Sequence, residues 1–167
     1  ATPVRFSGGR KYPVYQGPGP DYGQSGGGRA MVSTNDWIQV FGVENGYAMI
    51  QYDITRDHMR IGWIDASALP VTASVPALRF HPVSAWTTAA VTLTDDPLHS
   101  GSAIITLPRG AWVTRLAVMG DWAYVESSTG DLLRGFVPRS ALTEDQVFRL
   151  ESCPWDDGRA PLRGTLT

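Results

Sequence analysis

Hydrophobic and polar residues alternate with a period of two along much of this chain, the pattern of half-buried β-strands. In segment 37–44, Ile38 and Val40 occupy one side of the alternation, and segment 47–52 continues it around Ile50. No apolar repeat of helical period extends beyond about one turn. The pattern therefore predicts an all-β protein with no more than short 3₁₀ turns, expected at residues 67–69 and 140–142.

Two turn signals join the predicted strands into hairpins. Asn45-Gly46 lies between two alternating runs, and both residue types tolerate a positive φ, as a tight hairpin turn requires. Gly120-Asp121 stands at the corresponding place later in the chain. We expect a β-hairpin at each dipeptide.

The chain also contains an internal repeat, which predicts two folded units. Length differences between the copies fall only in turn-rich stretches, where loops tolerate insertion. The copies span residues 12–69 and 89–142. The matching segments are 37–50 with 112–125, 62–64 with 135–137, and 14–18 with 93–97.

The repeat divides the chain into four predicted parts. Residues 1–70 form a first unit with an N-terminal arm, 71–88 an apolar linker, 89–145 a second unit and 146–167 a C-terminal tail. A unit of about 60 residues buries too little surface to be more than marginally stable alone. We expect the linker to pack across the junction and to fix one unit against the other. Its apolar residues are Val75, Leu78, Phe80, Val83 and Trp86.

The alternation also predicts which side chains fill the interiors. Arg115 stands where the first copy has Val40, so this guanidinium must find a partner or reach solvent. The predicted core residues are Ile38, Val40, Ile50, Ile64, Val113, Val125 and Val137.

Composition and charge narrow the function classes. A formal net charge of −2 and a pI of about 5.9 provide no basic stripe, so we expect no nucleic-acid partner. No apolar run approaches the roughly 18 to 20 residues that span a bilayer, which predicts no transmembrane segment. The start at Ala1, without an initiator Met or a signal-peptide pattern, indicates a trimmed mature chain.

Few residues offer catalytic or cofactor chemistry. Cys153 is the single cysteine, and no His lies near it in sequence, so we expect an incidental thiol. Asp95 and Asp96 precede a proline, which favours a turn role over a catalytic dyad. The glycines of loop 17–28 match no phosphate-binding fingerprint. We predict neither catalysis nor any cofactor, and His58, His81 and His99 lack metal-ligand spacing.

The order of these motifs resembles the bacterial SH3 domain family. The first copy carries the resemblance in residues 14–19, 44–47 and 62–64, and the second in 120–122 and 135–137. The resemblance implies an all-β fold of two tandem small SH3-like β-barrels in a secreted, extracellular or cell-envelope bacterial protein. It also implies non-catalytic recognition of peptidoglycan or cell-wall peptides, with a cell-wall peptide or glycan as the partner. The alternative is a structural or protein–protein interaction module that docks a partner domain.

Aromatic residues opposite the core parity are the candidate ligand contacts, because they supply rigid area with a polar end. We expect the site in the first copy, between loop Gly17–Gly28 and the hairpin face that bears Tyr47. The competing interpretation is that these side chains cover the core or the junction. The candidate ligand-binding residues are Tyr15, Tyr22, Tyr47, Met49, Trp122 and Tyr124.

Overall fold

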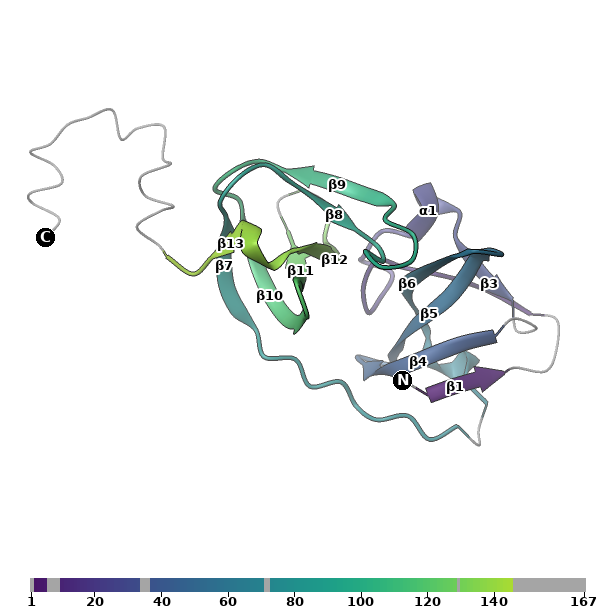
Figure 1. Cartoon of the computed structure of the whole chain (residues 1–167). Helices are drawn as coiled ribbons and strands as arrows, with labels where there is room; N and C mark the ends of the chain where they lie inside the picture. The colour runs from purple at the N-terminus through teal and green to yellow at the C-terminus, as the bar shows by residue number, and fades with distance from the viewer. Residues whose placement is uncertain (1, 6–9, 34–36, 71–72, 129, 146–167) are drawn as a thin grey trace, which may run out of the picture.

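A computed structural model describes residues 2–5, 10–33, 37–70, 73–128 and 130–145, and these form an almost entirely β protein (Figure 1). The all-β prediction is therefore confirmed. Among the described residues, no helix has both the length and the hydrophobicity to cross a membrane. The tail from residue 146 onward, with Cys153, lies outside the described residues.

The first half of the chain, residues 2–70, forms a four-stranded antiparallel sheet in the order β1-β4-β5-β6 and a separate β2-β3 pair. A glycine turn, α1, precedes β3, with Gly26 and Gly27 at left-handed φ angles of 62° and 67°, and a 3₁₀ turn, η1, follows β6. The elements are β1 (Thr2–Arg5), β2 (Lys11–Pro13), α1 (Ser25–Gly28), β3 (Met31–Ser33), β4 (Trp37–Glu44), β5 (Tyr47–Thr55), β6 (His58–Asp65) and η1 (Ala66–Ala68).

The second half, residues 83–145, forms one seven-stranded sheet in the order β13-β7-β10-β11-β12-β8-β9. The two halves lie side by side in Figure 1, with the segment before β7 running along one edge of both. The elements are β7 (Val83–Thr87), β8 (Val91–Thr94), β9 (Ala103–Leu107), β10 (Trp112–Met119), β11 (Trp122–Ser127), β12 (Leu133–Pro138), η2 (Arg139–Ala141) and β13 (Leu142–Thr143).

The segments that align in sequence form equivalent strands, and even their irregularities coincide. The β4–β5 ladder shifts register between Val40 and Gly42, and the β10–β11 ladder shifts between Arg115 and Ala117. A β-bulge of this kind bends the strand and turns its side chains toward a new face. The shared bulge is why the two long hairpins bend at the same aligned position.

The predicted hairpin turns are present in both halves. Asn45 and Gly46 adopt positive φ angles of 53° and 75°, which match the right-handed twist of the flanking strands. In the second half, Gly120 has a φ of 59°. The predicted 3₁₀ turns are also observed, as η1 and η2.

A glycine in each half lets one strand cross closely over another. A Cβ on Gly62 would lie 2.3 Å from Val14 Cγ1, and one on Gly135 would lie 2.9 Å from Ile104 Cδ1. The backbones of Tyr15 and Trp63 exchange hydrogen bonds of 2.8 and 3.0 Å at the first crossing. At the second crossing, Phe136 pairs with Thr94 in the same way.

The linker is shorter than the sequence predicts, because residues 83–87 form β7 and pair with β10. Strand β1 pairs with β4 in the same antiparallel manner, so each half begins one strand before the predicted repeat. The remaining linker is fastened to β4 by Val43, which donates to Pro76 O at 3.0 Å and accepts from Leu78 N at 2.8 Å. The linker also contacts the second half, where His81 N donates to Leu116 O at 3.2 Å.

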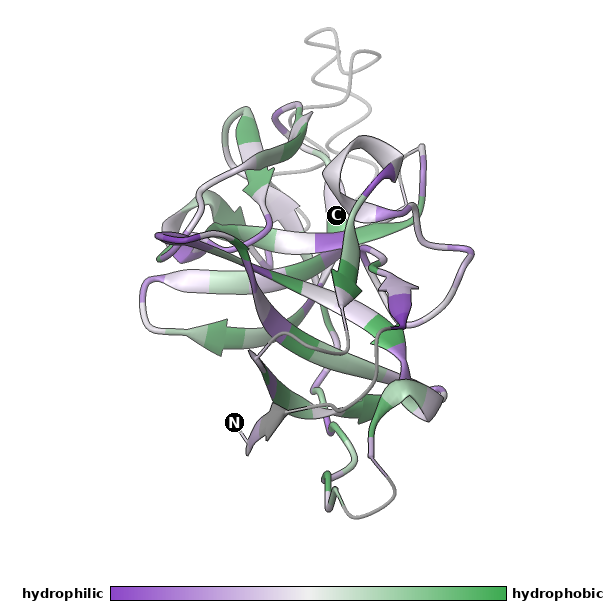
Figure 2. Cartoon of the chain, turned by 90° about the vertical axis from the view of Figure 1, so that its right-hand side faces the viewer, coloured by the Kyte–Doolittle hydropathy of each residue, from purple (hydrophilic) through white to green (hydrophobic). Residues whose placement is uncertain are grey.

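Each half has its own apolar core, and Figure 2 shows hydrophobic residues along the strands and hydrophilic ones at many connecting loops. Arg115 finds the expected partner, an ion pair with Glu144 at 2.9 Å. The predicted core residues are all confirmed, with exposed fractions of 2% or less: Ile38, Val40, Ile50, Ile64, Val113, Val125 and Val137.

Candidate functional site

The face of each hairpin opposite the core is the surface on which the two halves pack together. Met49 and Tyr124 occupy aligned positions, as do Trp63 and Phe136, and all four are buried in one shared cluster. Each half therefore presents the same patch, as in an isologous dimer interface. The buried members are Met49, Ile61, Trp63, Leu116, Tyr124 and Phe136, with Phe41, Tyr47, Leu78, Phe80, Ala117 and Trp122 packed around them.

A buried hydrogen bond lies at the centre of this junction. The Trp63 indole Nε1 donates to Tyr124 Oη at 2.9 Å. Burial raises the pKa of the Tyr124 hydroxyl well above its ordinary value, although the hydrogen bond from Trp63 acts in the opposite direction. Tyr124 is thus a neutral, structural residue.

Replacing Trp63 with phenylalanine should lower the free energy of unfolding by about 1–3 kcal/mol, because the Tyr124 hydroxyl loses its buried donor. Trp112→Phe is the matched control, since Trp112 is 40% exposed. Urea unfolding of both variants measures the difference. Equal losses for the two variants would show that this hydrogen bond contributes nothing.

Arg134 is the second anchor of the junction, and the sequence analysis missed it. Its Nη2 lies 2.8 Å from Glu44 Oε2 and its Nε lies 2.9 Å from Glu126 Oε1, so one guanidinium joins both halves. Burial lowers the pKa of Arg134, but the hydrogen bonds to Glu44 and Glu126 outweigh it and the pKa is raised. In the sequence, Arg134 stands out only as a charged residue between Leu133 and Gly135 in a predicted strand. The guanidinium lies over the rings of Tyr22, Trp63 and Phe80 at 5.4, 5.3 and 5.7 Å.

Tyr22 belongs to this anchor. Its hydroxyl donates to Glu126 Oε1. Burial, followed by this hydrogen bond, raises the pKa of Tyr22 to about 12. Loop Gly17–Gly28 is therefore held against the second half by one of the tyrosines that we expected to face a ligand.

The acidic turn of the second half makes the reciprocal contact with the first. Arg60 Nε lies 2.6 Å from Asp95 Oδ2, and Gln51 Nε2 donates to Asp96 Oδ2 at 2.9 Å. Asp96 also accepts the Leu98 amide at 3.2 Å, which is the local bond of an aspartate turn. The expected turn role of both acids agrees with these contacts, and both side chains also fasten the junction.

The predicted ligand-binding residues lie in three different environments. Met49 and Tyr124 are only 7% and 4% exposed, so they point away from the cores but are not open to a ligand, which agrees with the competing interpretation that such side chains cover the junction. The reason is that the opposite half covers this face. Tyr47 and Trp122 lie half-buried at the junction margin, and Tyr47 meets Tyr15 edge-to-face at 6.1 Å.

Several hollows open on the described surface, among them one of about 340 Å³ between β10 and residues 79–83. A larger one, which we call the cleft, has a volume of about 430 Å³ and lies where loop Gly17–Gly28 of the first half meets β9 and residue 131 of the second. The expected loop therefore walls a concavity, but its partner is the second half rather than the Tyr47 face. The cleft is lined by Gln16, Gly23, Gln24, Gly26, Gly27, Gly28, Arg60, Asp95, Ser102, Ala103, Ile104, Asp131 and Leu133.

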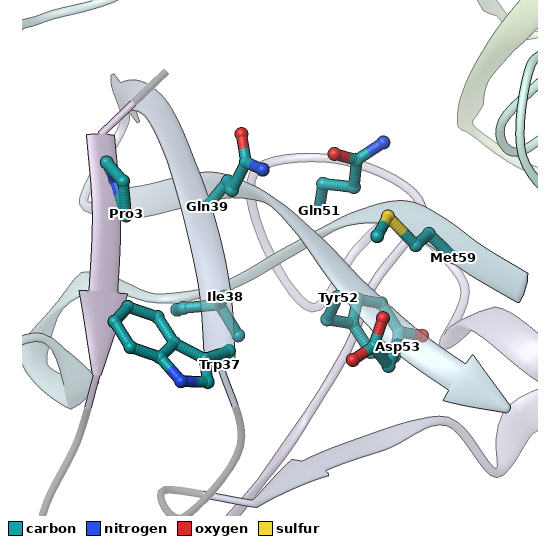
Figure 3. A pocket seen from close by; sticks show the side chains of 8 residues that line it. All are labelled: Pro3, Trp37, Ile38, Gln39, Gln51, Tyr52, Asp53 and Met59. Atoms are coloured by element: carbon teal, nitrogen blue, oxygen red, sulfur yellow. The ribbon is translucent and has the colours of Figure 1, made fainter. Parts of the chain in front are cut away.

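A smaller hollow, which we call the groove, lies on the first sheet and has a volume of about 290 Å³ (Figure 3). Trp37 is 54% exposed beside it, and the sequence analysis did not select this residue. A signal existed, because Trp37 alternates with the core residue Ile38 and heads the aligned segment. The groove is lined by Pro3, Trp37, Ile38, Gln39, Gln51, Tyr52, Asp53 and Met59.

Among the described residues, no group of three or more His, Cys, Asp or Glu side chains is placed to hold a metal ion. Apart from Arg60, which is paired with Asp95, the cleft and the groove offer amides, carboxylates, an aromatic ring and exposed glycine backbone.

Comparison with known proteins finds distant likeness only. No family model and no curated protein matches the chain. A solved structure of NlpC2 from Trichomonas vaginalis is 16% identical with a TM-score of 0.35, covering 85% of this chain and 47% of that one. NlpC1 from the same organism is 16% identical with a TM-score of 0.36, covering 85% and 45%. The chain spans about half the length of these structures, and likeness at this level carries no functional argument.

Proposed function

We propose that this protein is a non-catalytic cell-envelope binding module built from two SH3-like units in tandem, and that it recognises cell-wall peptides. The aligned strands, the shared bulge and the shared glycine crossings support the two-unit interpretation. The resemblance of the sequence motifs to bacterial SH3 domains supports the class of ligand and the location outside the cell.

The cleft between the two halves is the observation that carries this proposal. Arg60 and Asp95 neutralise each other there, which leaves the exposed Asp131 as the remaining formal charge of the lining. Gly26 and Gly27 lack side chains, so their backbone is open to close approach. Amides, backbone groups and one carboxylate suit a short peptide with a free ammonium group.

Retention on purified peptidoglycan, followed by titration with soluble muropeptides, tests the proposal. Ala103 is exposed and lines the cleft, so Ala103→Trp should fill it without entering the core and weaken muropeptide binding about tenfold or more. Ala89→Trp is the matched control, because Ala89 is exposed and outside the cleft lining. Asp131→Asn should weaken binding less, and more at low salt.

Two outcomes would contradict the proposal. Wild-type protein that is not retained on peptidoglycan contradicts the proposed function. Retention of Ala103→Trp at wild-type affinity, with amide shifts unchanged, contradicts the cleft as the site.

Docking to a partner protein is the second candidate, and a separate surface favours it. Trp112, Val118 and Met119 lie on β10 with exposed fractions of 40%, 43% and 38%. Val118 also lines a hollow of about 340 Å³ together with the apolar Phe80, Leu116 and Ala117, and contiguous apolar surface of this kind is typical of interaction sites. Capture of one discrete protein from an envelope extract, lost in Val118→Asp, would support this candidate over peptidoglycan binding.

A further inference from the structure

The groove on the first sheet has features that neither the junction nor the cleft explains. Its floor is the strand backbone at Ile38 and Tyr52, whose side chains point into the core and are 2% and 3% exposed, and Trp37 rises beside it with 54% of its surface exposed. Figure 3 shows Trp37 on one side, Asp53 and Met59 on the other, and Ile38 and Tyr52 between. An aromatic ring thus lies across the strand backbone from a carboxylate and a methionine.

Polar side chains complete the groove and are suitably placed for hydrogen bonding. Asp53 and Gln39 are exposed on β5 and β4. Gln51 is oriented by the second half, because its Nε2 donates to Asp96 Oδ2 at 2.9 Å. This bond leaves the Gln51 carbonyl oxygen available as an acceptor and fixes where it lies.

We propose that the groove binds a short, neutral saccharide of N-acetylated hexose units. A pyranose ring has an apolar C–H face, which packs on an indole, and a rim of hydroxyl groups, which bond to carboxylate and amide side chains. An acetamido group carries one N–H donor and one carbonyl acceptor. A glutamine side chain also has a donor and an acceptor, so it can pair with both groups. Asp53 is the single formally charged residue of the eight in the lining, so the groove disfavours anionic ligands.

The topology argues against an extended peptide as the occupant. Strand β4 is paired on both edges, with β1 and β5, and β5 is paired with β4 and β6. A peptide lying over these two central strands therefore finds no free strand edge to extend the sheet, whose outer strands are β1 and β6. The volume of about 290 Å³ also lies near the lower end of small-molecule sites, which fits a short saccharide.

The second half provides a natural comparison. Trp112 aligns with Trp37, but Thr114, Glu126 and Ser128 stand at the positions of Gln39, Gln51 and Asp53. Glu126 is already bonded to Arg134 at 2.9 Å. The second half thus repeats the aromatic ring without the polar set, and we expect one saccharide site per chain.

Titration with chitotriose, the β-1,4 trimer of N-acetylglucosamine, tests this inference through tryptophan emission and amide shifts. Wild-type protein should saturate, and Trp37→Ala should weaken binding about tenfold or more, because the ring supplies the main apolar contact. Asp53→Asn should weaken binding several-fold, and Trp112→Ala should remain within about twofold of wild type. Cellotriose, which lacks the acetamido groups, should bind at least about fivefold more weakly.

Several outcomes would overturn the inference. They are a wild-type protein that does not respond to chitotriose, equal losses in Trp37→Ala and Trp112→Ala, or equal affinity for cellotriose. Urea unfolding establishes that each variant is folded before titration.

The saccharide site and the peptide cleft can fail separately. Chitotriose carries no peptide, so Ala103→Trp should bind it with wild-type affinity while losing the muropeptide. Loss of both ligands in Ala103→Trp would contradict the independence of the groove.

Discussion

Replacing Arg134 with methionine should lower the free energy of unfolding by about 3 kcal/mol, a large effect for one residue in a domain of this size. Methionine keeps much of the apolar stem volume but removes the guanidinium. Glu44 and Glu126 are then left without their partner, at 29% and 25% side-chain exposure. Tyr22 also loses the cation that lies 5.4 Å from its ring centre.

A double-mutant cycle separates the charge effect from lost packing. In a Glu126→Gln background, Arg134→Met should cost measurably less, because one of the two orphaned carboxylates is gone. Arg56→Met is the control for arginine loss at an exposed position and should change stability by no more than about 0.5 kcal/mol. A full-size loss in the Glu126→Gln background would show that the pair with Glu126 is not what makes Arg134 stabilising.

Replacing Ile50 with alanine should lower the free energy of unfolding by about 2–5 kcal/mol, because it leaves a cavity in the core of the first half. Ile50 is 0% exposed and pairs with Val40, another core residue. Val125→Ala tests the aligned position of the second half and should cost less, since fewer atoms are removed. Urea unfolding measures both variants.

The control lies on the same sheet. Gln39 is exposed on the opposite face of β4, so Gln39→Ala should change stability by no more than about 0.5 kcal/mol. A loss below about 0.5 kcal/mol for Ile50→Ala would contradict the observed orientation of β5.

Reciprocal packing explains why so many aromatic residues in this chain are structural. Each half is small and gains burial by covering the same face of the other. Tyr22 in loop Gly17–Gly28 of the first half contacts Glu126 and Arg134. Asp95 and Asp96 of the second half contact Arg60 and Gln51. The cleft and the groove, which we propose as ligand sites, lie at the edges of this arrangement.

The sequence by itself determined the local structure and the two cores. Alternation with a period of two identified the strands, because neighbouring side chains of a strand point to opposite faces. Asn45-Gly46 determined a turn, since few other pairs adopt two positive φ angles at low cost. The aligned segments predicted which strands are equivalent, and the buried alternate positions around Ile50 and Val125 followed from the same pattern.

Only the tertiary structure decided what the other face of each hairpin does. Alternation places Met49 and Tyr124 opposite the core. The alternation does not determine whether that face is exposed to water or covered by a second layer. The pairing of Arg134 with Glu44, and the exposure of Trp37 beside Asp53, bring together residues from separate strands. Such contacts depend on how the halves and strands pack, and local sequence does not encode that arrangement.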